Sequence, residues 1–182
     1  SYPATLDSYH DGEIRPGGVF SISGQGGGFN YLISETSEPR YNNSIGRETS
    51  ILGDFLPNDL VREEFTVDQT NNELSLNIGY DIASNSSIRF NALYGNNDNP
   101  TDVDRVTANL RTTPNGITLE REDVPGERDN WEIGGDYEFT RNNGHRFKLL
   151  AIANQDNRDT TRNRFLTLPD GSEEQNLFLN TG

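Results

Sequence analysis

Cysteine and methionine are both absent from this chain of 182 residues, and it contains no long apolar run. The lack of cysteine excludes disulfides and thiolate metal sites. No stretch approaches the roughly 18 consecutive apolar residues of a membrane-spanning helix, which excludes a helical membrane protein. A membrane protein built from strands is not excluded, because each strand needs only about 9–11 residues and half of them can be polar.

Positive charge is also scarce. The chain has 15 Lys and Arg against 29 Asp and Glu, a formal net charge of −14. Nucleic acid is therefore not an expected partner, because phosphate neutralisation needs clustered basic residues and those here are scattered. Hydrophobic residues make up 31% of the chain, which is little for one soluble core. Disordered chains share such a composition, but the strand periodicity of this sequence argues against disorder.

The beginning of the sequence lacks the usual start signals. No charged segment followed by an apolar stretch opens the chain, so we expect any export signal to lie upstream of Ser1. Because even an initiator methionine is missing, we expect a processed or excised piece of a longer protein.

Large apolar and polar residues alternate strictly in several segments. In residues 74–81 the even positions are Leu, Leu, Ile and Tyr, and the odd positions are Ser, Asn, Gly and Asp. The same alternation follows in residues 88–94 after a turn. Because side chains of a strand point alternately to opposite faces, each segment has one apolar and one polar face. This pattern is typical of a lipid-facing barrel wall and also of a soluble sheet with one buried face.

Three hairpins with short turns are predicted from this alternation. They pair residues 18–23 with 29–34, residues 73–81 with 87–95, and residues 131–139 with 146–153. Residues 1–17 are predicted as a loop, and a last strand begins near Asn176. The sequence thus predicts an all-β fold, an antiparallel up-and-down meander of about six to seven strands. Across the third hairpin, we expect Glu138 to pair with Lys148.

Long polar connections separate the hairpins. They are predicted as loops over residues 35–72, 96–130 and 155–176, although the alternation in 61–67 allows a strand to begin there. Within the second connection, residues 103–112 and 116–123 flank a Thr-Pro-Asn turn and predict a hairpin standing above the main sheet. Short turns that alternate with long loops are typical of outer-membrane barrels, whose extracellular loops are the long ones.

Aromatic residues lie at both ends of the predicted strands. Tyr80, Tyr137 and Phe139 lie beside short turns, whereas Tyr94 and Trp131 lie at the opposite strand ends. This placement matches the aromatic girdles at the two interfaces of a membrane, and it also fits the aromatic core of a soluble sheet.

No motif in the sequence predicts catalysis. The glycine-rich residues 24–28 lead into a strand and lack the Lys-Ser or Lys-Thr of a phosphate-binding loop. His10 and His145 have no cysteine beside them, and the acidic residues 97–104 lack the glycine and glutamate of an EF-hand loop. We therefore predict no enzyme: no catalytic residues, no cofactor and no metal ligands.

The segments that alternate most clearly resemble the early barrel strands of TonB-dependent outer-membrane receptors. The resemblance rests on patterns of strand and turn chemistry rather than on an invariant signature, and it spans most of the chain. It is carried by residues 15–24, 29–31, 73–94, 130–139 and 146–150.

The resemblance implies a partial receptor barrel in the bacterial outer membrane. Such a receptor has a plug domain inside a barrel of about 22 strands. It receives energy through TonB and imports a scarce ligand such as a siderophore, cobalamin or an oligosaccharide. Residues 1–182 would form one incomplete domain without a plug or a closing strand. The implied partners are outer-membrane lipid, the rest of the barrel, the plug, TonB and a small-molecule or oligosaccharide ligand.

Ligand contacts are expected in the long connections, because a rigid scaffold positions its loops for recognition. Their candidate aromatic residues are Tyr41, Phe55, Phe65 and Phe165. With the acids and amides around them, they favour a sugar-like or cationic ligand over an anionic one. Two alternatives stay open from the sequence: a secreted soluble β-domain that binds carbohydrate or acts as an adhesin, and an acidic hydrolase on a β scaffold.

Overall fold

The computed structural model describes residues 4–8, 12 and 14–181. Over these residues the chain forms ten strands in one antiparallel sheet and contains no helix. The predicted all-β, antiparallel fold class is thus confirmed. Among the same residues, no helix is long and apolar enough to cross a membrane.

Most strands are longer than the sequence predicts. The strands are β1 (Ala4–Ser8), β2 (Ile14–Gly26), β3 (Phe29–Ile51), β4 (Pro57–Ala83), β5 (Ser86–Asp98), β6 (Thr101–Asn109), β7 (Gly116–Val124), β8 (Gly126–Thr140), β9 (Arg146–Thr167) and β10 (Glu173–Thr181).

The chain divides into two compact units. The first contains residues 1–39, 70–97 and 128–157, and the second contains residues 40–69, 98–127 and 158–182. The first unit therefore holds the three hairpins with strong apolar alternation. The second gathers most of the three polar connections, although they are far apart in sequence.

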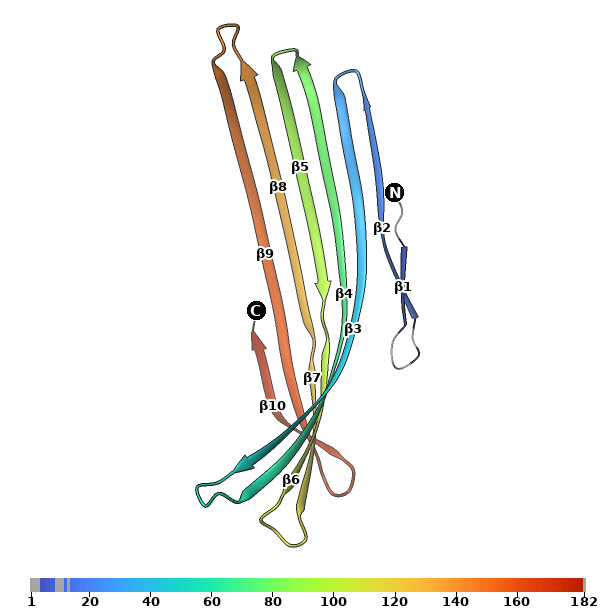
Figure 1. The fold of residues 1–182 in the computed structure, drawn as a ribbon, viewed down its shortest axis with the longest axis vertical. Coiled ribbons are helices and arrows are strands. Elements are labelled where there is room, and N and C mark those ends of the chain that lie inside the picture. Colours follow the sequence, from blue (N-terminus) through green and yellow to red (C-terminus); the bar gives the residue numbers. More distant parts are fainter. Residues whose placement is uncertain (1–3, 9–11, 13, 182) are drawn as a thin grey trace. The chain divides into compact units, whose positions relative to one another are not determined.

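Three hairpins with short turns build the first unit. They are β2–β3, β4–β5 and β8–β9, and their turns lie at the same end of this unit (Figure 1). In β2–β3, Ile22 lies opposite Ile33, and Gly24 lies opposite Tyr31. A Cβ on Gly24 would lie only 2.6 Å from Cε1 of Tyr31, so the missing side chain leaves room for the ring of the neighbouring strand.

The order of strands in the sheet follows the chain once two short breaks are recognised. Only Asn99 and Pro100 separate β5 from β6, and only Pro125 separates β7 from β8. The Asn99 amide donates to the carbonyl of Gly126 at 2.8 Å, and the Thr161 amide donates to the carbonyl of Pro125 at 3.1 Å, so pairing continues at these breaks. Because proline has no amide hydrogen, it interrupts the ladder locally. Neighbours in sequence thus pair as the meander predicts.

The predicted long loops are wrong. Most of residues 35–72, 96–130 and 155–176 is strand, and the connections within them shrink to turns such as 52–56, 110–115 and 168–172. The expected hairpin over residues 103–123 exists as β6–β7, but it pairs on both sides, with β4 and β9, rather than standing above the sheet. Backbone hydrogen bonds between strands need no apolar side chains, so hydrophobic alternation does not detect polar strands.

The predicted count of six to seven strands is also too low, because the described residues form ten. Residues 4–8, expected as loop, form β1 and pair with residues 14–18 of β2.

His10 lies outside the described residues, and His145 lies in the turn between β8 and β9.

Polar and apolar side chains separate on the strands of the first unit. The hydroxyl groups of Ser34 and Ser75 are 2.7 Å apart, and the side chains of Asn71 and Asn97 form a hydrogen bond, so the odd positions of β4 share a polar face. Of ten large apolar and aromatic residues of β4, β5 and β8, five are exposed: Leu74, Tyr80, Ile88, Phe90 and Ile133. The other five are partly exposed: Leu76, Ile78, Trp131, Tyr137 and Phe139.

Charge pairs in the third hairpin are shifted from the expected positions. Arg146 forms an ion pair with Glu138, and Nζ of Lys148 lies 3.7 Å from Oδ2 of Asp136. The expected pair of Glu138 with Lys148 is therefore replaced by these two pairs. Long side chains can reach an acid two residues along the facing strand, which permits such diagonal pairing.

Very little of the described chain is buried. Val103, at 4% exposure, is the one apolar residue that the described part of the chain buries, while Ile33 is 37% and Leu149 60% exposed. A soluble domain of this length would bury a contiguous apolar core. The sheet therefore lacks the packing that normally stabilises a protein in water.

We predict that the chain, expressed alone, precipitates in water and stays dispersed only in detergent. The reason is that its apolar rows have no protein partner, and large exposed apolar surface drives association. Size-exclusion chromatography and far-ultraviolet circular dichroism, with and without detergent, would measure this. A monodisperse monomer that melts cooperatively without detergent contradicts it.

Candidate functional site

The second unit brings five strand segments side by side, as the pairing of opposite residues shows. Phe65 of β4 lies opposite Val103 of β6, Val103 opposite Glu122 of β7, and Glu122 opposite Arg164 of β9. Residues directly opposite one another share a face of the sheet. These side chains therefore form one row, which we call the Glu122 row, and Leu177 of β10 extends it opposite Arg164.

A cavity of about 310 Å³ lies on this face. Its volume is at the lower end of the range for small-molecule sites. Apolar and hydroxyl side chains dominate its wall, with one carboxylate and one guanidinium. The lining residues are Phe65, Thr101, Val103, Glu122, Val124, Thr160, Arg162, Leu179 and Thr181.

Glu122 is the most deeply buried charged side chain of the described residues, at 1% exposure. Its Oε1 accepts a hydrogen bond from Nε of Arg162, and its Oε2 accepts one from Nε of Arg164 at 2.8 Å. Each carboxylate oxygen is therefore bonded to a different cation. A buried carboxylate needs such partners because desolvation of an unpaired charge is costly.

The ionisation of Glu122 is favoured by these partners. Burial alone would raise its pKa, but the hydrogen bonds and the positive charges of Arg162 and Arg164 outweigh burial and lower the pKa below its usual value. The carboxylate thus stays charged at neutral pH.

A second row of ions lies next to the Glu122 row on the same face. Arg105 of β6 lies opposite Glu63 of β4 and Glu120 of β7. Its Nε donates to Glu63, and its Nη1 donates to Oε2 of Glu120 at 3.4 Å. One cation therefore links three strands through two carboxylates.

The opposite face of the second unit carries another ion cluster. Arg121 forms ion pairs with Asp123 and with Glu173, where its Nη2 lies 3.0 Å from Oε2. Its guanidinium carbon lies 4.7 Å from the ring centroid of Phe165, a cation–π contact. On the same face, burial and the charge of Asp123 raise the pKa of Asp102.

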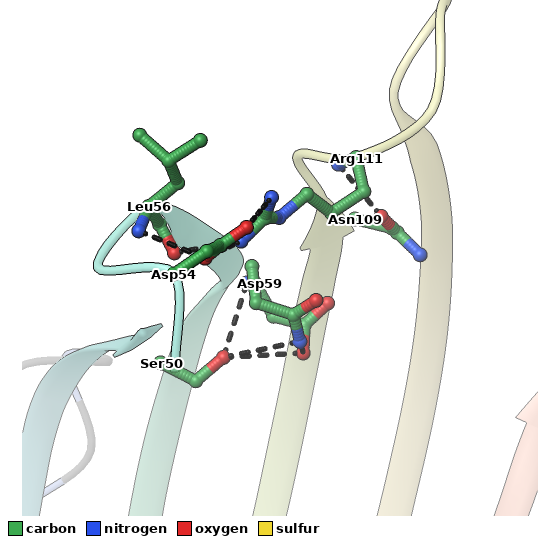
Figure 2. A network of polar contacts seen from close by, with 7 residues as sticks. Ser50, Asp54, Leu56, Asp59, Asn109 and Arg111 are labelled. Atoms are coloured by element: carbon green, nitrogen blue, oxygen red, sulfur yellow. Dashed lines mark hydrogen bonds and ion pairs between the residues drawn. The ribbon is translucent and has the colours of Figure 1, made fainter. Parts of the chain in front are cut away.

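Two hairpin tips of the second unit are clasped by one arginine. Arg111 donates two hydrogen bonds to Asp54, of 2.8 Å and 2.7 Å, and a third of 2.9 Å to the carbonyl of Leu56 (Figure 2). The hydrogen bond with Arg111 lowers the pKa of Asp54. Between the two clasped residues, Phe55 has φ of 60° and is 87% exposed. Positive φ is uncommon for a bulky residue.

The four aromatic candidates do not form one site. Phe65 lines the cavity, Phe165 lies on the opposite face beneath Arg121, and Phe55 occupies the β3–β4 tip. Tyr41 lies in β3, two residues before Asn43, whose amide donates to Oγ1 of Thr66 at 3.0 Å. Three of the four are strand residues rather than loop residues, which corrects the prediction, and only Phe65 belongs to the cavity.

The sequence did not indicate the central residues of the cavity. Glu122, Arg162 and Arg164 are ordinary charged residues in a polar stretch, and 40 residues separate Glu122 from Arg162. Only the register of β7 with β9 brings them together. Among the residues that the structure describes, no group of three or more His, Cys, Asp or Glu side chains is placed to hold a metal ion.

No protein-family model and no curated protein matches this chain.

We predict that Glu122→Gln lowers the free energy of unfolding of the second unit by about 2 kcal/mol at pH 7. The reason is that Arg162 and Arg164 lose the anion that they share. Glu173→Gln, at an exposed ion pair, should change it far less. Urea denaturation in detergent would measure both. Equal effects of the two variants contradict a special role of Glu122.

The same comparison has a defined pH dependence. Because the folded-state pKa of Glu122 is lowered, its contribution is fully present above the unfolded pKa and is lost as pH falls through the folded value. The stability difference between the wild type and Glu122→Gln should therefore shrink below about pH 4. A difference that stays constant from pH 7 to pH 3 would show that the charge of Glu122 does not stabilise the fold.

Proposed function

We propose that residues 1–182 form part of the barrel wall of a TonB-dependent receptor in the bacterial outer membrane, which imports a scarce ligand. One observation carries this proposal: the sheet buries a single apolar residue among those described, yet its first unit displays rows of half-exposed Leu, Ile, Phe and Tyr side chains. Lipid is the solvent in which such rows are stable without a protein core.

The contrast between the two units supports the same assignment. Strands of the first unit alternate apolar and polar residues and end in short turns, as strands in contact with lipid do. Strands of the second unit are held by ion pairs such as those of Arg105 and Glu122, which suit an aqueous surface. We therefore assign residues 18–37, 73–95 and 131–153 to the membrane and the second unit to the extracellular side.

The partners in this proposal are those of the receptor family that the sequence resembles. The remainder of the barrel would pair with the open strand edges, because about ten strands do not close a barrel of this family. A plug domain would fill the lumen, and TonB would supply energy. In this proposal, the extracellular unit meets its ligand at the cavity beside Glu122.

Strand β4 provides a direct test of lipid contact. The chain has no cysteine, so Leu76→Cys and Ile78→Cys can each carry one nitroxide, with Ser75→Cys and Asn77→Cys as matched controls on the polar face. In lipid vesicles, we expect the even positions to be accessible to oxygen and the odd positions to a water-soluble nickel complex. Electron paramagnetic resonance measures both accessibilities.

Two results would contradict the membrane assignment. If positions 76 and 78 are protected from both reagents, they lie against a second protein layer, which favours the secreted soluble β-domain. If all four positions are accessible to the nickel complex alone, the strand lies in water.

The gene provides a test of the receptor assignment itself. We predict that coding sequence upstream of Ser1 encodes a plug domain and that sequence downstream of Gly182 encodes further alternating strand pairs. Sequencing a few hundred codons on either side is sufficient, given the size of a barrel of about 22 strands. Flanks without a plug and without further strand pairs contradict the receptor assignment, whatever the spin-label result.

A further inference from the structure

Two groups of ion pairs lie at or beside the cavity. Glu122 contributes one negative charge, and Arg162 and Arg164 contribute two positive charges. Glu63 and Glu120 in the neighbouring row are bonded to Arg105 and do not line the cavity. Glu122 and Arg162 are therefore the two charged residues of the cavity wall, and Arg164 bonds to Glu122 from outside it.

The guanidinium of Arg162 is placed where a ligand can reach it. Arg162 uses only its Nε for Glu122, and no described residue accepts a hydrogen bond from its terminal nitrogens. Its side chain is 44% exposed, and it lines the cavity. A guanidinium whose Nε is anchored keeps a fixed orientation, and its two terminal amines suit the two oxygens of a carboxylate.

The rest of the cavity wall suits an apolar body. Phe65, Val103, Val124 and Leu179 supply aromatic and aliphatic surface. The hydroxyl groups of Thr101, Thr160 and Thr181 are the other polar groups there, and each can donate as well as accept. Few polar groups around an apolar wall are typical of small-molecule sites, in which the polar groups fix orientation.

We propose that this cavity binds a small amphipathic carboxylate, an apolar ring or chain with one carboxylate group. The carboxylate bonds to the terminal amines of Arg162, and the apolar part packs against Phe65, Val103 and Leu179. This inference rests on the proposed function, since it names the class of ligand that the extracellular unit recognises. It also replaces the sugar-like or cationic ligand expected from composition, because a cation would meet Arg162.

The test measures binding of phenylacetate to the full chain in lipid nanodiscs by equilibrium dialysis, with empty nanodiscs as the blank. Phenylacetamide is the matched neutral probe, since it has the same ring and nearly the same shape. We expect phenylacetate to bind at least about tenfold more tightly, as a charge-assisted hydrogen bond is lost with the amide.

Three variants locate the site. Arg162→Met should weaken phenylacetate binding about tenfold or more and leave phenylacetamide binding unchanged. Arg121→Met removes an equal charge from the opposite face and should change neither. Val103→Phe keeps every charge but fills the cavity, so it should weaken both probes.

Several outcomes would overturn the proposal. Equal binding of phenylacetate and phenylacetamide, or phenylacetate binding that survives both Arg162→Met and Val103→Phe, shows that the cavity does not recognise a carboxylate. Binding of methyl glucoside or choline in place of phenylacetate shows a different ligand class. A failure of this proposal can be distinguished from a failure of the receptor assignment. The receptor assignment is tested by the spin-label accessibilities of β4 and by the flanking coding sequence, and neither depends on phenylacetate binding.

Discussion

Hydrogen bonding between neighbouring strand backbones is the interaction on which this structure depends. All ten described strands are joined in one sheet, whereas Val103 is the single apolar side chain buried among the described residues. In water, a ladder without a core gains little, because unfolded backbone groups bond equally well to solvent. In lipid the same groups have no alternative partner, so the ladder becomes obligatory. The proposed lipid environment of the first unit would therefore stabilise its ladder without a protein core.

Ion pairs link the strands of the second unit, where the apolar alternation of the first unit is absent. In the second unit, Arg105 links β4, β6 and β7, while Glu122 links β7 to β9 through Arg162 and Arg164. Isolated exposed ion pairs contribute little to stability. Rows that share one ion between two partners can contribute more, because their geometry is fixed by several strands at once. Charge patterning, rather than hydrophobic packing, therefore specifies the register of these polar strands.

How much of this structure the sequence predicts depends on the same difference between the two units. Residues 74–81 and 88–94 are recognisable because one face of each strand must be apolar, and the alternation in 61–67 correctly indicates the start of β4. The strand over residues 35–51 is not recognisable, because its side chains are polar on both faces. Phe65 could be selected as a candidate because it is an aromatic residue within a long polar connection. Glu122 could not, because its partners follow from a register that no local pattern records.

Register also explains how an acidic chain can present a guanidinium group to a cavity. Of the residues opposite one another in the Glu122 row, only one is acidic, and the strand β9 brings Arg164 into the row and Arg162 beside it. A shift of β9 by one residue would turn both arginines to the other face, toward Asp102 and Asp123. There they would be neutralised by acids instead of surrounding one. The charged groups that line the cavity are therefore set by strand pairing, and the net charge of the chain does not predict them.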